Sequence, residues 1–118
     1  MLWIALILML GAAAGGLAML TLVLSGKHVP LILAFGHAAV ALSGIGVIIA
    51  DIARSELQPL YAWAALACFT LGAMGGSYLL SNHMRGRKSS HLLRAAHITA
   101  IGAGLIMLIM GVIKESWA

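Results

Sequence analysis

Two histidines, His37 and His97, stand inside long apolar segments of this 118-residue chain. An ionisable residue inside an apolar span is costly, so it marks a functional site by default. Imidazole nitrogens bind metal ions and exchange protons near neutral pH. The two histidines are 60 residues apart, and sliding the chain by that distance aligns its halves without a gap. The pattern predicts one site, built between two equivalent helices.

The internal repeat pairs residues 1–58 with residues 61–118 and contains twelve identities. The alignment is significant because it matches rare residue types: Trp3 aligns with Trp63, and His37 aligns with His97. Three further correspondences involve glycine: Gly15-Gly16 with Gly75-Gly76, Gly26-Lys27 with Gly86-Arg87, and Gly44 with Gly104. The chain is therefore expected to consist of two copies of one structural unit.

The composition indicates an integral membrane protein that forms a single membrane domain over residues 1–118. Hydrophobic residues make up 63% of the chain and charged residues only 8%, whereas soluble domains carry about 25% charged residues. The net charge of +4 does not predict nucleic-acid binding, because the basic residues gather in a short loop between apolar spans. The single cysteine, Cys68, cannot form an internal disulfide.

Four apolar spans are expected at approximately 2–24, 30–50, 60–81 and 95–113. Each is close to the roughly 20 residues that a helix needs to cross the bilayer. The connections between them are short, which favours antiparallel neighbours. The predicted fold is all-α: an up-down-up-down transmembrane four-helix bundle made of two tandem two-helix repeats.

The loop charges predict the orientation of this bundle. Five basic residues fall on the side of the first and third loops: Lys27, Arg85, Arg87, Lys88 and Arg94. The other side has two basic residues and all three acids: Arg54, Lys114, Asp51, Glu56 and Glu115. Lys and Arg in short loops stay cytoplasmic. Both termini are therefore expected outside, in the periplasm if the membrane is a bacterial inner membrane.

The repeat also predicts where the histidines lie. Each copy contains two spans, so the copies have the same orientation and are related by an axis along the membrane normal. His37 and His97 should face each other across this axis at equal depth, on diagonal helices roughly 12–14 Å apart. That distance suits a flat macrocycle held from both faces. The glycine doublets at 15–16 and 75–76 lie near the same depth and would leave room for a large planar ligand.

With these features the chain resembles the small four-helix transmembrane b-type cytochromes. The resemblance rests on the four-span plan and six residues: Gly15, Gly16, His37, Gly75, Gly76 and His97. It implies that His37 and His97 ligate haem b and that the glycines make room for the ring. Better-known members hold two haems with four membrane histidines. Here only two are available in the spans, so one haem per chain is expected. A second would need a methionine ligand or a histidine expected in the loops: His28, His83 or His91.

Several alternatives remain open from the residues alone. The histidine pair could make structural hydrogen bonds or relay protons, or it could bind another metal, although zinc would want four ligands. The small residues Ala12, Gly16, Gly72 and Gly76 also fit close helix packing or a homodimer interface. The basic third loop could serve orientation and contact with anionic lipid. Alternatively, Arg94 together with Lys88 or Lys27 could meet the haem propionates.

The predicted function is that of a membrane b-type cytochrome, in which a bis-histidine haem between the second and fourth helices transfers electrons. Two axial histidines leave the iron no open position, which favours electron carriage over oxygen activation. A quinone, a small oxidant or a redox partner protein would complete the path, so enzymatic turnover is left open. The alternatives are a cofactor-free accessory subunit of a membrane complex and a small histidine-lined transporter or proton pathway.

Overall fold

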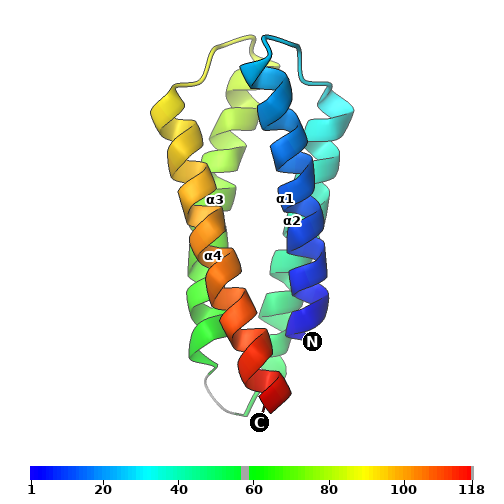
Figure 1. Ribbon diagram of the computed structural model, residues 1–118, viewed down its shortest axis with the longest axis vertical. Helices are drawn as coiled ribbons and strands as arrows, with labels where there is room; N and C mark the ends of the chain where they lie inside the picture. The colour runs from blue at the N-terminus through cyan, green and yellow to red at the C-terminus, as the bar shows by residue number, and fades with distance from the viewer. Residues whose placement is uncertain (57–58, 118) are drawn as a thin grey trace.

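The computed structural model describes residues 1–56 and 59–117. Its elements are four helices: α1 (Leu2–Leu24), α2 (Leu31–Arg54), α3 (Leu60–Met84) and α4 (His91–Trp117). They form an elongated bundle of 47 × 21 × 20 Å (Figure 1). Each helix is long and apolar enough to cross a membrane. The chain is thus a membrane protein with four helices in a bundle, each capable of spanning the bilayer.

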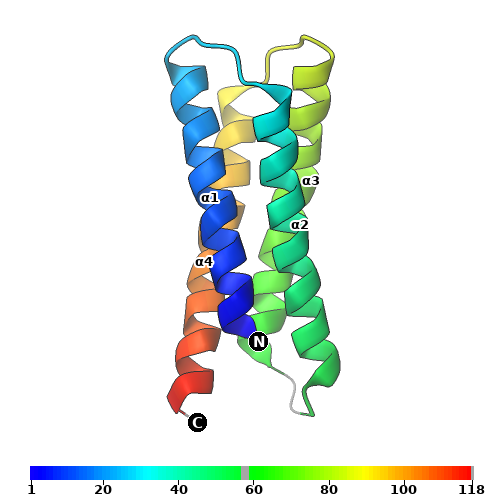
Figure 2. The same ribbon diagram turned by 90° about the vertical axis from the view of Figure 1, so that its right-hand side faces the viewer.

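The bundle consists of two hairpins. α1 packs on α2 and α3 packs on α4, and the hairpins meet through α2 with α3 and α1 with α4. The connections 25–30 and 85–90 lie together at one end, here called the loop end, whereas both chain termini lie at the opposite, terminal end (Figures 1 and 2). The loop-end half contains a cavity lined by residues from all four helices.

Both connections at the loop end begin with the same glycine turn. Gly26 and Gly86 have φ values of +70° and +68°, in the left-handed region that glycine adopts without steric cost. The amide of Lys27 donates to Leu22 and that of Arg87 donates to Asn82, both over 2.8 Å. These bonds close a Schellman motif at the end of α1 and of α3. The repeated Gly–basic pair in the sequence therefore ends both helices in the same way.

Three helices extend beyond the spans expected from hydropathy. α2 continues to Arg54, α3 continues to Met84, and α4 runs from His91 to Trp117. Hydropathy marks only the part of a helix that would lie in hydrocarbon, while backbone hydrogen bonding continues through its polar ends. The expectation that His83 and His91 lie in loops is therefore wrong, because they lie in the last turn of α3 and at the start of α4. Residues 58 and 118, where the predicted repeats end, lie outside the described residues.

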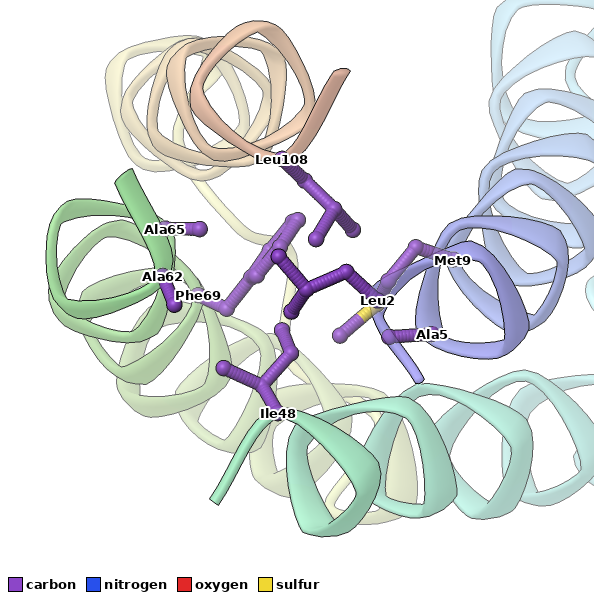
Figure 3. Packing of buried hydrophobic residues seen from close by; sticks show 8 residues of the cluster. All are labelled: Leu2, Ala5, Met9, Ile48, Ala62, Ala65, Phe69 and Leu108. Atoms are coloured by element: carbon purple, nitrogen blue, oxygen red, sulfur yellow. The ribbon is translucent and has the colours of Figure 1, made fainter. Parts of the chain in front are cut away.

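The buried hydrophobic core lies in the terminal half of the bundle, near the starts of α1 and α3 and toward the ends of α2 and α4. Figure 3 shows how its side chains pack. It brings together side chains from all four helices: Leu2, Ala5, Met9, Ile48, Ala62, Ala65, Phe69 and Leu108. Glycines let the helices approach within each hairpin. A Cβ at Gly104 would lie 2.8 Å from the Phe69 ring, and one at Gly44 would lie 3.1 Å from the Met9 methyl group. The repeat thus places a glycine against a core side chain in each hairpin, Gly44 against Met9 and Gly104 against Phe69.

Candidate functional site

His37 is held by a backbone carbonyl of its own hairpin. It lies on α2, six residues after the helix begins at Leu31. Its Nδ1–H donates to the carbonyl oxygen of Ala12 on α1 over 2.7 Å. A carbonyl oxygen can only accept, so Nδ1 carries the hydrogen. The neutral ring therefore has its lone pair on Nε2.

His97 repeats this arrangement in the second hairpin. Its Nδ1–H donates to the carbonyl oxygen of Gly72 on α3, also over 2.7 Å. Ala12 and Gly72 are 60 residues apart, like the two histidines, so the repeat extends to the hydrogen-bond partners. Both hydrogen bonds use Nδ1 and leave Nε2 of each ring available. A histidine held through Nδ1 by a carbonyl, with Nε2 free, has the fixed tautomer and orientation typical of metal ligands.

The glycine doublets make this placement possible, because each imidazole lies directly against one of them. A Cβ at Gly16 would lie 3.2 Å from Cε1 of His37, and one at Gly76 would lie 3.0 Å from Cε1 of His97. At Gly15 and Gly75 the nearest atom, a histidine Cβ, is 3.7 Å away, an ordinary contact distance. The sequence predicted space for a planar ligand at these glycines. In the structure, the space at Gly16 and Gly76 accommodates the histidine rings themselves.

The two imidazoles meet between the hairpins. Their ring centroids are 6.4 Å apart and their planes are inclined by 71°. The pair is therefore close, although the histidines come from diagonal helices that make few direct contacts with each other. One hairpin supplies each ring, so any group held between the rings would join the two halves of the protein.

A cavity of about 880 Å³ surrounds the pair. This volume falls within the range of about 300–1,000 Å³ that is usual for ligand pockets. Met9 and Phe69 line it on the side of the core, and His37 and His97 line its walls. Most other lining residues are apolar or small, and they come from all four helices. The cavity can therefore hold a largely apolar ligand of considerable size.

Basic and polar side chains surround the loop end of this cavity, a set called the rim: His83, Arg87, Lys88, Ser89, His91 and Arg94. Arg94 is half-buried, and its guanidinium lies 3.1 Å from Nδ1 of His91. Lys27, although on the same end, is not among the described residues that line the cavity. The predicted association of Arg94 and Lys88 with the site is consistent with their place in the rim.

A second histidine pair ties the hairpins together at the loop end. The rings of His28 and His83 have centroids 5.2 Å apart and planes inclined by 31°. Nε2–H of His83 donates to the carbonyl oxygen of Val29 over 2.9 Å. No sequence pattern predicts this pair, because the repeat equivalents of His28 and His83 are Lys88 and Val23. The contact joins the first loop to α3 beside the cavity.

The structure brings most of the predicted site residues to one cavity. His37, His97, Gly16, Gly76 and Arg94 line it. Two further predicted residues, Gly15 and Gly75, contact the histidines from the side of α1 and α3. Sequence reasoning missed the carbonyls of Ala12 and Gly72 and the two residues at the core side, Met9 and Phe69. A backbone carbonyl has no sequence signature, but the constant separation of 25 residues between each histidine and its acceptor follows from the repeat.

Comparisons of the chain with protein-family models, curated proteins and solved structures find no match. Its function is therefore inferred from the geometry and chemistry of the site.

Proposed function

We propose that the protein is a b-type cytochrome of a bacterial inner membrane, holding one haem b between His37 and His97 for electron transfer. The observation that carries this proposal is the spacing of the two imidazoles, with centroids 6.4 Å apart. When two imidazoles hold one metal, each metal–nitrogen bond is about 2 Å long, and each ring centre lies half a ring width beyond its nitrogen. The two ring centres are then about 6 Å apart. The spacing is thus close to that of two axial ligands on one metal.

The hydrogen bonds of the two histidines support the same role. Each Nδ1–H is used by a carbonyl, so Nε2 is the nitrogen left to coordinate a metal. The bond also fixes the ring and raises its basicity as a ligand. Because Ala12 and Gly72 offer backbone atoms, this arrangement is built into the helices.

The ligand set favours a macrocycle over a bare ion. Among the described residues there is no group of three or more His, Cys, Asp or Glu side chains that could hold a metal ion. A zinc site would need four ligands, most of them from the protein. Haem would need only two ligands from the chain, and His37 and His97 would supply them. When bound, it would supply one-electron transfer at a potential set by its ligands and burial.

The cavity provides the remaining contacts that such a group requires. The apolar walls match the faces and edges of a porphyrin, and the basic rim would pair with its two carboxylates. Arg94 suits this role because it lies one turn before His97 on α4 and lines the cavity. Gly16 and Gly76 keep the two imidazoles in position. In this view the up-down-up-down bundle of two tandem repeats exists to present one histidine from each half.

The decisive experiment is the absorption spectrum and haem content of the purified protein, expressed with ample haem. We expect sharp α and β bands on reduction and about one haem per chain. His37→Ala or His97→Ala should each abolish the low-spin spectrum, because one ligand alone cannot keep iron six-coordinate. His28→Ala is the matched control and should keep it.

A colourless wild-type protein would refute the proposal. The hydrogen bonds of His37 and His97 to backbone carbonyls would then be structural, as expected for a cofactor-free accessory subunit of a membrane complex. An unchanged spectrum in both the His37→Ala and the His97→Ala variant would place the haem elsewhere in the chain.

A further inference from the structure

The cavity lies much nearer one end of the bundle than the other. His37 is six residues from the start of α2 at the loop end and 17 residues from Arg54 at the terminal end. At 1.5 Å per residue these separations are about 9 Å and 25 Å. Electron tunnelling falls exponentially with distance, and water-soluble reagents need a polar path. The two ends are therefore very unequal routes to the site.

The terminal half offers no polar route. Leu2, Ile48, Phe69 and Leu108 are at most 2% exposed and pack together (Figure 3). None of the described residues is a buried polar or charged side chain. Protein interiors packed in this way leave few voids larger than a water molecule. Met9 and Phe69 belong to this core and also line the cavity, so the packed half closes the cavity on the terminal side.

The loop end has the opposite character. Arg87, Lys88 and Arg94 line the cavity mouth, while the three acids of the chain are on or beside the terminal ends of α2 and α4. Asp51 makes an ion pair there with the amino group of Met1 at 3.4 Å. No carboxylate of the chain balances the positive charge of the rim, and the five basic residues of the loop end would outnumber the two carboxylates of a bound haem. A cleft lined by one sign of charge concentrates ions of the opposite sign.

We infer that the site is reached from one end of the bundle only: its reaction partners are water-soluble anions that reach it across the rim at the loop end. This inference rests on the proposed function in one respect, that the partners are redox molecules. An anionic one-electron reductant is oxidised at the rim, and an anionic one-electron oxidant is reduced at the same rim. The terminal end takes no part, so the protein does not conduct electrons across the bilayer.

The first test needs no haem and uses single cysteines in a Cys68→Ser background. Ser89→Cys reports on the rim, Val112→Cys on the packed half and Ser116→Cys, as a control, on the exposed terminal end. Each is reacted in phosphatidylcholine nanodiscs with an anionic sulfonatoethyl thiosulfonate and its cationic trimethylammonium analogue. We expect the ratio of anionic to cationic labelling rates to be roughly tenfold higher for Ser89→Cys than for Ser116→Cys. Val112→Cys should react with neither reagent.

Substitution of the rim and a change of lipid complete this test. Arg87→Gln with Lys88→Gln, or high salt, should remove the anion preference of Ser89→Cys. An anion-to-cation ratio equal to that of Ser116→Cys would overturn the inference, as would rapid labelling of Val112→Cys. Loss of the preference on adding phosphatidylglycerol would also overturn it, because lipid headgroups would then occupy the rim.

The second test uses haem-loaded protein in sealed vesicles, with orientation measured by external labelling of Ser116→Cys. Dithionite, an anion that crosses bilayers slowly, is added outside in a stopped-flow instrument. Only molecules with the loop end outward should be reduced quickly, and opening the vesicles with detergent should then let dithionite reduce the rest. Rapid reduction of molecules with the terminal end outward would overturn the inference. Protein that contains no haem would refute the proposed function. The cysteine-labelling results would still test access to the cavity.

Discussion

The imidazole rings of His37 and His97 face each other from different hairpins, 6.4 Å apart, with their planes inclined by 71°. The inclination is fixed on each side by a hydrogen bond from Nδ1 to a backbone carbonyl of the same hairpin. Neither ring can rotate without breaking its bond to Ala12 or Gly72. The angle between the rings is therefore a property of how the two hairpins pack against each other.

This angle predicts the electron paramagnetic resonance spectrum of the proposed ferric haem. Each axial imidazole donates into the iron d orbital that is perpendicular to the ring plane. Parallel rings split the two d orbitals of this type, whereas rings near 90° leave them almost degenerate. With planes inclined by 71°, we expect a strongly anisotropic low-spin signal dominated by one large g value. A rhombic signal with three well-separated g values would show that the rings become parallel on binding.

The glycine doublets allow a comparison between adjacent positions. A methyl group at Gly76 would lie 3.0 Å from Cε1 of His97, while one at Gly75 would meet nothing closer than 3.7 Å. Gly76→Ala should therefore displace the ring, lower the haem content and broaden the α band, whereas Gly75→Ala should behave like the wild type. Gly16→Ala and Gly15→Ala should show the same order, with a smaller difference because the contact at Gly16 is 3.2 Å. Equal effects at both positions of a doublet would indicate that the glycines serve helix packing instead.

Much of this architecture was accessible from the sequence, and the reasons are physical. Four apolar runs of helical length predicted the four helices, and the 60-residue repeat predicted that His37 and His97 lie on equivalent helices. The hydrogen-bond acceptors were not accessible, because any residue type can provide a carbonyl oxygen. The roles of Gly16 and Gly76 were seen only in part, since a missing side chain does not reveal what fills its space. The helical position of His83 and His91 was missed because hydropathy does not detect polar helix ends.

The packed half of the bundle predicts where the protein is most sensitive to cavities. Phe69 is 1% exposed and contacts Gly104, whereas Leu71, on the same helix, is 64% exposed. Lipid and the interior of the bundle are similarly apolar, so moving a side chain between them changes the free energy little. The cost of the substitution therefore comes mainly from lost packing. We expect Phe69→Ala to lower the free energy of unfolding by about 1–3 kcal/mol. Leu71→Ala should change it little. Unfolding titrations in mixed micelles would measure both, and equal losses would show that Phe69 is not tightly packed in the membrane.

The distribution of charge predicts the orientation in the membrane. Arg85, Arg87 and Lys88 lie in the connection between α3 and α4, and Lys and Arg in short loops stay cytoplasmic. A reporter active only in the periplasm should therefore be active when fused after the last residue and inactive when inserted next to Ser90. Replacing the three basic residues with Gln should produce a mixed orientation, because two Lys or Arg residues then remain at each end. Replacing Lys114 with Gln, as a control, should leave the orientation unchanged. A cytoplasmic signal from the C-terminal fusion would reverse the orientation and place the rim, with the cavity beside it, on the outer side of the membrane.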